Sequence, residues 1–202
     1  MNASIELILF DLGGVLVELR GRPIPQDWLP DDMRFDCTDF LLSETAKSFE
    51  KGLIDAQSFA ESIKEELNIE VSPENIIQHF TDWPVGLFPG AHQLLKSINS
   101  RFRLAVLSNT NELHWPRITS EFMITHYFEK IFASHLLKMA KPELDIFKHV
   151  ISELGVEPDR ILFLDDNQNN IDAARHLGIH GIQVSGIQQA QKVLCGVGAI
   201  GD

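Results

Sequence analysis

Short, continuous apolar runs recur along the chain, and between them apolar residues return every three or four positions. The runs are rich in Ile, Val, Leu and Phe and do not alternate with polar residues. This pattern is typical of parallel strands that are covered on both faces of a sheet. The predicted strands span residues 7–10, 104–107, 130–133, 161–164 and 181–184.

Helical periodicity fills the intervals between these strands. Residues 142–154 place Ile146, Phe147, Val150, Ile151 and Leu154 on one face. Pro142 suits the first helical turn and Gly155 the C-terminal cap, and the pattern of 171–177 stops at Gly178. Alternating strands and helices predict an α/β fold, a Rossmann-like doubly wound parallel sheet. Right-handed crossovers then bring the carboxyl ends of the strands to one edge, where such folds bind ligands.

Residues 17–87 interrupt this alternation. They show no pattern of a buried strand, a Pro-rich lead-in, and helical patterns that end before Gly52 or begin at Pro73. We therefore predict an inserted small helical cap domain over 17–87, with a core of 1–16 and 88–202. The turn-rich stretch 83–90 is the expected hinge that returns the chain to the core.

Composition narrows the class of protein. The chain has 202 residues and a formal net charge of −12, which disfavours binding to a nucleic-acid backbone. Cys37 and Cys195 have no metal-binding spacing, so we expect a reducing, cytoplasmic location. The first residues resemble neither a signal peptide nor a membrane span, and residues 196–202 are expected to be frayed. The oligomeric state is left open.

Four polar stretches fall at or just beyond predicted strand ends, and the third of them opens a predicted helix. They are Asp11 with two glycines, the stretch 108–111, Lys141, and the acid pair Asp165 and Asp166. Each stretch alone is explained by a helix cap or a solvated charge. Two adjacent acids beside a buried strand end repel each other, however, so a bound cation would relieve a real cost. Because all four stretches converge on one edge, they predict a site there.

These stretches, in this order, resemble the four motifs of the haloacid dehalogenase-like superfamily of phosphohydrolases. FDLGGVL is similar to the first motif, LSNTN to the second, AKPELDIF to the third and LFLDDNQNNIDAARHLG to the fourth. The resemblance covers nearly the whole chain. Within the superfamily, FDLGGVLVEL and the cap stretch FEKGLIDAQSFAESI are similar to sugar phosphatases that act on α-D-glucose 1-phosphate.

The resemblance implies a role for each motif. Asp11 would attack phosphorus and form an aspartyl-phosphate intermediate. The expected cofactor is Mg²⁺, held by Asp11, the backbone carbonyl of Gly13, and Asp166. The acid Asp165 would order a metal-bound water or orient Lys141.

The remaining motif residues are expected to bind the phosphate. Ser108, the backbone of Asn109, and Lys141 would hold the transferring oxygens, and Lys141 would also offset the charge of Asp11. Asn170 is expected to support the loop that carries Asp166. A small phosphate ester is the implied partner, with no nucleic acid and no membrane.

One expected group is missing. The usual first motif of this superfamily carries a second aspartate, which protonates the leaving oxygen, and Gly13 stands in its place. Three explanations compete. In the first, the substrate has an acidic leaving group, as in a hexose 1-phosphate. In the second, Glu18 or His114 replaces the acid. In the third, the site is inert and the protein is a binding module.

Dehalogenases of the superfamily also lack the second aspartate. Their metal-free reaction has no need for paired acids at the fourth motif, so the pair of Asp165 and Asp166 argues for a metal and a phosphate. The expected function is therefore a Mg²⁺-dependent phosphatase for a small metabolite, with a sugar phosphate such as a hexose 1-phosphate preferred.

Overall fold

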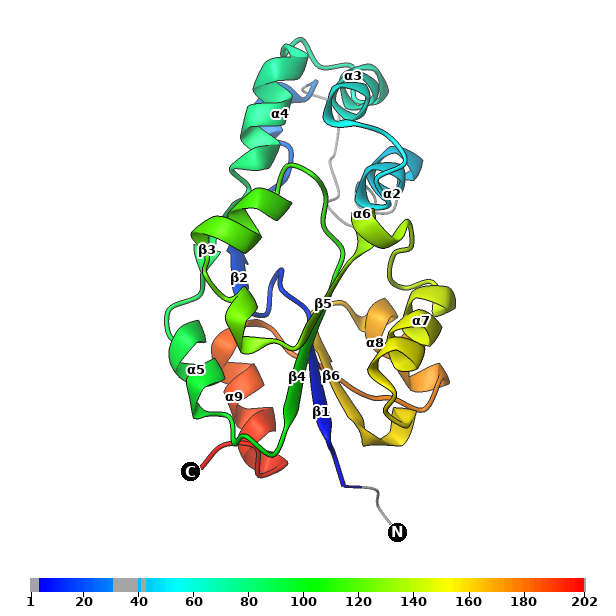
Figure 1. The fold of residues 1–202 in the computed structure, drawn as a ribbon. Helices are drawn as coiled ribbons and strands as arrows, with labels where there is room; N and C mark the ends of the chain where they lie inside the picture. Colours follow the sequence, from blue (N-terminus) through cyan, green and yellow to red (C-terminus); the bar gives the residue numbers. More distant parts are fainter. Residues whose placement is uncertain (1–3, 31–39, 41–42, 202) are drawn as a thin grey trace.

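A five-stranded parallel sheet forms the centre of the computed structural model, which describes residues 4–30, 40 and 43–201 (Figure 1). The strand order is β5-β4-β1-β6-β7. The strands are β1 Leu7–Phe10, β4 Arg103–Ser108, β5 Lys130–Ala133, β6 Ile161–Asp165 and β7 His180–Gln183. Each of the five predicted strands is therefore present, with ends that differ by at most one residue. β1 lies between β4 and β6 and is fully buried.

Helices cover both faces of this sheet, α5 and α9 on one face and α7 and α8 on the other (Figure 1). They are α5 Ala91–Ser97, α7 Leu144–Leu154, α8 Gln168–His176 and α9 Gly186–Gly196. Ile8 and Phe10 of β1 pack in one hydrophobic cluster with the first pair, while Leu7 and Leu9 pack in a second cluster with the other. The prediction of a Rossmann-like α/β fold is confirmed.

Helix α7 begins later than its sequence pattern predicts. Its N-cap is Glu143, so Pro142 lies before the helix, and its expected place in the first turn is wrong. The main chain just before Pro142 is hydrogen-bonded to the segment after β4, because the Lys141 N–H donates to Oδ1 of Asn109 at 2.9 Å. The predicted end is correct: Gly155 has a φ of 62°, in the left-handed region that glycine adopts readily.

In the described part of the chain, the inserted segment carries a hydrophobic cluster of its own and three helices with defined bounds. They are α2 Glu44–Glu50, α3 Ala56–Glu66 and α4 Pro73–Thr81, preceded by a 3-10 turn, Gln26–Trp28. Phe49, Phe59 and Phe80 are buried in this cluster, and the ring centroids of Phe49 and Phe59 lie 4.4 Å apart. Pro73 occupies the start of α4, as predicted.

A short antiparallel ribbon joins the insertion to the core. It pairs β2 Val17–Leu19 with β3 Pro84–Leu87, and Val17 lies opposite Leu87. The sequence predicted no buried strand in this segment, and only the first residue of each of these two strands is buried. The strands are three and four residues long, too short to produce a recognisable pattern of alternation.

The C-terminal stretch also differs from its prediction. Ala199 is buried, its N–H donates to the Leu194 carbonyl, and its own carbonyl accepts from Asn99. Frayed ends make no such bonds, so the expectation fails for 196–201. The remaining short elements are the π-helical turn Arg117–Glu121, helix α6 Ser134–Leu137, and the 3-10 turns Thr125–Tyr127 and Pro158–Arg160.

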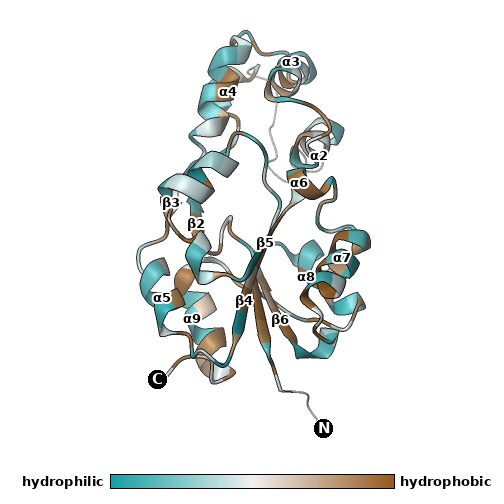
Figure 2. Cartoon of the chain, in the orientation of Figure 1, coloured by the Kyte–Doolittle hydropathy of each residue, from teal (hydrophilic) through white to brown (hydrophobic). Residues whose placement is uncertain are grey.

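Apolar residues concentrate on the central strands, whereas the outer faces of the helices are hydrophilic (Figure 2). Within the described ranges, no helix combines the length and the hydropathy that crossing a membrane requires. Cys195 is a half-buried free thiol, and Cys37 lies outside the described residues.

Candidate active site

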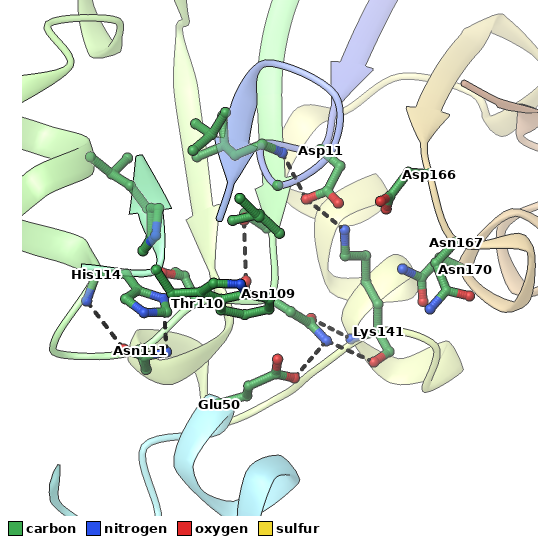
Figure 3. A pocket seen from close by; sticks show the side chains of 18 of the residues that line it. Asp11, Glu50, Asn109, Thr110, Asn111, His114, Lys141, Asp166, Asn167 and Asn170 are labelled. Carbon is green, nitrogen blue, oxygen red and sulfur yellow. Dashed lines mark hydrogen bonds and ion pairs between the residues drawn. The ribbon is translucent and has the colours of Figure 1, made fainter. Parts of the chain in front are cut away.

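The carboxyl ends of three neighbouring strands bring the predicted motifs together. Phe10 is in register with Val106 and Leu164, so Asp11 leaves β1 level with the last residue of β6. The Asp11 N–H continues the ladder by donating to the Leu164 carbonyl at 2.8 Å. A cavity of about 420 Å³ lies at this edge (Figure 3). Its lining includes Asp11, Gly13, Ser108, Asn109, Lys141, Asp166 and Asn170.

Lys141 is the centre of a buried ion-pair network. Its Nζ lies 2.9 Å from Oδ1 of Asp11 and 2.6 Å from Oδ2 of Asp165, and it donates to the Leu107 carbonyl at 3.0 Å. These three partners use the three donors of an ammonium group. Burial alone would lower the pKa of Lys141, but the carboxylates of Asp11 and Asp165 raise it above its usual range. Lys141 is therefore charged at neutral pH and offsets part of the charge of Asp11.

Asp165 is fully buried beneath the cavity and is saturated with hydrogen bonds. Besides Lys141, its carboxylate accepts from the Asn167 N–H at 2.8 Å and from Nδ2 of Asn170 at 3.0 and 3.1 Å. Asn170 therefore holds Asp165 in place, and Asp165 in turn holds Lys141. This geometry fits the expected supporting parts of Asp165 and Asn170, and it leaves Asp165 little capacity to bind anything else.

Asp11, Asp165 and Asp166 form an acidic cluster whose oxygens can lie within 4.8 Å of one another. The Asp166 backbone carbonyl accepts from Nε2 of Gln183 at 2.8 Å, but, in contrast to Asp165, its carboxylate accepts no hydrogen bond from another described residue. Across the described residues, the Gly13 carbonyl likewise accepts no hydrogen bond. Carboxylate and carbonyl oxygens are the ligands that Mg²⁺ prefers, and these oxygens have no hydrogen-bond donor that would compete with it.

The charge balance of the cluster also calls for a cation. Burial raises the pKa of Asp11 to about 8; Lys141 lowers it, and the two neighbouring acids raise it. Burial, followed by repulsion from Asp165, raises the pKa of Asp166 to about 6. One lysine thus leaves the three acids with uncompensated negative charge. A divalent cation beside Asp11 and Asp166 would hold both as carboxylates, so the residues present fit such an ion.

The second motif closes another side of the cavity. Ser108, the last residue of β4, is buried at the cavity wall. The Asn109 side chain fastens the motif to the third one: its Nδ2 donates to the Lys141 carbonyl at 3.0 Å, and its Oδ1 accepts from the Lys141 N–H. The side chain of Asn109 is thus used structurally, and its backbone borders the cavity beside Ser108.

His114 lines the cavity but has no free ring nitrogen. Its Nε2 lies 2.6 Å from the Phe80 carbonyl, which can only accept, and its Nδ1 lies 3.1 Å from Nδ2 of Asn111. Burial lowers the pKa of His114 to about 4, although the bond to Phe80 raises it. The neutral ring therefore has its single proton committed to a backbone carbonyl. This is the environment of a structural histidine.

Glu18 lies on the other face of the β2–β3 ribbon. Side chains alternate along a strand, and the neighbours Val17 and Leu19 line the cavity while Glu18 is exposed. The structure therefore does not bring Glu18 to the site.

Two charged residues of the cavity wall were not singled out from the sequence. Lys47 and Glu50 both belong to α2, and Oε2 of Glu50 accepts from Nδ2 of Asn109 at 3.0 Å (Figure 3). A signal for Glu50 exists: a carboxylate in the last turn of a helix opposes the helix dipole, so its presence there is locally unfavourable.

A family model described as haloacid dehalogenase-like hydrolase matches residues 5–178. The chain therefore belongs to the haloacid dehalogenase-like hydrolases.

Named relatives align along most of the chain. A D-ribitol-5-phosphate phosphatase from Bacteroides thetaiotaomicron is 25% identical, and the match covers 89% of this chain and 91% of the relative. A sesquiterpene phosphatase from Aspergillus oryzae is 27% identical, with 92% of each covered. A similar solved structure is that of a haloacid dehalogenase family enzyme from Bacteroides thetaiotaomicron in complex with magnesium and inorganic phosphate. It has a TM-score of 0.73 and is 32% identical, and the match covers 89% of this chain and 94% of that chain.

Proposed function

We propose that this protein is a Mg²⁺-dependent phosphatase that hydrolyses a small phosphorylated metabolite through an aspartyl-phosphate intermediate. The observation that carries the proposal is the position of Asp11. It leaves the central strand at a cavity wall, next to one buried lysine and to a second acid, Asp166, that no described side chain neutralises. A nucleophilic carboxylate that must approach a phosphate anion needs this surplus of cation-binding groups.

Each side chain of the site has a part in this reaction. Asp11 attacks the phosphorus atom, and Lys141, held by Asp165, keeps the attacking carboxylate in place. Ser108 and the Asn109 backbone donate to the phosphoryl oxygens. When bound by Asp11, the Gly13 carbonyl and Asp166, Mg²⁺ supplies positive charge that offsets the charge of the transferring group. The relative solved with magnesium and inorganic phosphate supports this choice of ion.

The inserted segment, residues 17–87, is proposed to act as the cap that selects the substrate, over a core of 1–16 and 88–202. Lys47, Glu50, Phe80 and Trp83 of the insertion line the same cavity as Asp11. Apolar and aromatic walls with a few polar groups are typical of pockets for small molecules. A sugar phosphate, such as a hexose 1-phosphate, is the proposed substrate class, and the named D-ribitol-5-phosphate phosphatase supports a phosphorylated carbohydrate.

A substrate panel tests the proposal. The purified protein is assayed for release of inorganic phosphate from sugar, acyl and aryl phosphates, with Mg²⁺ and with EDTA. We expect release that depends on Mg²⁺ and is fastest for a sugar phosphate. Absence of release from every ester would contradict the phosphatase, and binding of phosphate analogues without turnover would indicate a binding protein.

A further inference from the structure

The acid that the first motif lacks is not excluded by space. A β-carbon at Gly13 would meet only Cδ1 of Leu19, at 3.4 Å, which is an ordinary contact. An alkoxide is a poor leaving group unless it receives a proton as the bond to phosphorus breaks. The protein therefore either restricts itself to acidic leaving groups or supplies the proton from another residue at the cavity.

The titratable groups of the cavity wall differ in the hydrogen bonds and ion pairs that they already make. Among the described residues these groups are Asp11, Lys47, Glu50, His114, Lys141 and Asp166. Asp11 and Asp166 are the proposed nucleophile and metal ligand. Lys141 has three partners, and both ring nitrogens of His114 are engaged. This leaves the two residues of α2, and of these Glu50 is the carboxylic acid.

Glu50 is fixed at the cavity by both its backbone and its side chain. Its carbonyl accepts from Oγ of Ser134 at 2.6 Å, and its Oε2 accepts from Asn109. No described residue binds Oε1, so one carboxyl oxygen is available at the cavity. Figure 3 shows Asp11 and Glu50 on opposite sides of the pair Asn109 and Lys141. An in-line transfer needs its nucleophile and its proton donor on opposite sides of the phosphoryl group, and an acid of the insertion that lines the same cavity as Asp11 is the kind of residue that can meet this need.

We infer that Glu50 is the general acid and base of this phosphatase and replaces the carboxylate missing at Gly13. The inference rests on the proposed function. In the first step, Asp11 forms a bond to phosphorus, and the leaving oxygen keeps the electron pair and takes the proton of Glu50. In the second step, the Glu50 carboxylate takes a proton from water, whose oxygen bonds to phosphorus. The bond between Asp11 and phosphorus breaks, which releases inorganic phosphate and restores both acids.

The surroundings of Glu50 suit both steps. Burial raises its pKa to about 7, while the charge of Lys141 and the hydrogen bond from Asn109 lower it. Both protonation states are thus populated at neutral pH, as a group that gives and later takes a proton requires. Other charged groups nearby are engaged: Lys51 pairs with Glu143, Lys138 donates to the Gly52 carbonyl, and Lys47 lies 3.7 Å from Glu44. A bound phosphate dianion would favour the protonated form further.

Glu50 could instead act only by positioning Asn109, and leaving-group chemistry separates the two roles. Glu50→Gln retains an oxygen that can accept from Asn109, but it has no acidic proton to give to a leaving group. The test substrates, with Mg²⁺, are p-nitrophenyl phosphate, whose leaving group needs no proton, and a primary-alcohol sugar phosphate. The matched control is Glu44→Gln, on the same helix with a side chain that is 93% exposed.

For Glu50→Gln with p-nitrophenyl phosphate, we expect a burst of nitrophenolate at a rate within about 3-fold of wild type. Later turnover is expected to be slower by about 10²-fold, with phosphorylated enzyme accumulating, because the second step lacks its base. On the sugar phosphate, the first step itself should slow by about 10²–10³-fold. Glu50→Asp should hydrolyse the sugar phosphate at least about 10-fold faster than Glu50→Gln, because it retains a carboxylic acid. The wild-type kcat/KM for the sugar phosphate should fall above pH 7, and Glu50→Gln should lose this dependence.

Equal slowing of the burst and of the sugar phosphate reaction would assign Glu50 to positioning and overturn the inference. Wild-type rates on both substrates would overturn it as well. In either case the phosphatase proposal stands. No Mg²⁺-dependent turnover by the wild-type protein would overturn the proposed function itself and this inference with it. Thermal unfolding of each variant shows whether it is folded, and Glu50→Asp provides the comparison if Glu50→Gln is not.

Discussion

Asp166 lies directly against Gly14: a β-carbon on Gly14 would stand 2.0 Å from Oδ2 of Asp166, and Gly14 has a φ of 68°. The second glycine of the first motif is therefore required by the fourth motif. Gly13 has no such constraint.

This contrast predicts different outcomes for neighbouring substitutions. Gly14→Ala should lower the free energy of unfolding by more than about 2 kcal/mol. The alanine would be strained in the left-handed backbone conformation, and its β-carbon would displace the Asp166 side chain. It should also abolish stabilisation by Mg²⁺. Gly13→Ala should cost less than about 1 kcal/mol. Urea unfolding with and without Mg²⁺ measures both, and equal losses for the two variants would contradict the geometry.

Asp11→Asn should reduce kcat by at least about 10⁴-fold, because an amide cannot form the aspartyl-phosphate. Mass spectrometry should detect a phosphorylated enzyme only when Asp11 is present. Asp145→Asn, an exposed acid of α7, serves as the control and should retain wild-type kcat. Turnover by Asp11→Asn near the wild-type rate would show that Asp11 is not the nucleophile.

Lys141→Met should lower the free energy of unfolding by about 3–5 kcal/mol, because it leaves Asp11 and Asp165 buried without their cation. Adding Asp165→Asn to this variant should recover part of the loss. Lys148→Met, on the exposed face of α7, should change stability by less than about 0.5 kcal/mol. Chemical denaturation measures all three variants, and a tolerated Lys141→Met would refute the importance of the network.

Mg²⁺ should stabilise the folded protein by about 2.7 kcal/mol at a concentration 100 times its Kd, provided that it binds only the folded state. Asp166→Asn should remove most of this effect. Asp172→Asn, an exposed acid of α8, should preserve it. Thermal unfolding against Mg²⁺ concentration is the measurement, and an undiminished shift in Asp166→Asn would remove Asp166 from the metal site.

His114 should make the protein less stable in acid. The unfolded chain protonates this histidine near pH 6.5, but folded His114 does so only near pH 4. The unfolded state thus binds more protons between these values, and stability falls as pH falls through this window, by about 2 kcal/mol at pH 5.

The buried acids with raised pKa values act in the opposite direction, so a comparison of variants is needed. His114→Gln should be less stable than wild type at pH 7 but should lose less stability between pH 7 and pH 5. The exposed His176→Gln should follow the wild-type dependence. Parallel pH dependence for His114→Gln and wild type would contradict the assignment.

The sheet could be predicted from sequence because its strands are covered on both faces, which makes them uninterrupted apolar runs. Asp11, Ser108 and Asp165 could be located because each comes at the end of such a run or directly after it, whereas Lys141 lies shortly before α7. Helix α9 has no comparable signal, since its buried positions are Ala190 and Leu194 amid polar residues.

The environment of a side chain was harder to predict than its element. Glu50 reaches the cavity only through the packing of α2 against α6 and the end of β4, contacts between segments far apart in the chain. The sequence made His114 a candidate acid, but hydrogen bonds to Phe80 and Asn111 engage both of its ring nitrogens. Such partners depend on tertiary geometry, which local periodicity does not encode.

The pairing of Val17 with Leu87 places the entry and the exit of the insertion side by side. Chain added between two adjacent points lengthens the protein without shifting the strand that carries Asp11. The ribbon therefore separates two kinds of sequence change: those between its strands affect the insertion's part of the cavity wall, including Glu50, while those outside affect Asp11 and the acidic cluster. Under the proposed function, an exchange of residues 20–83 between relatives is expected to change the preferred ester together with the residue at position 50, and to leave Asp11 where it is.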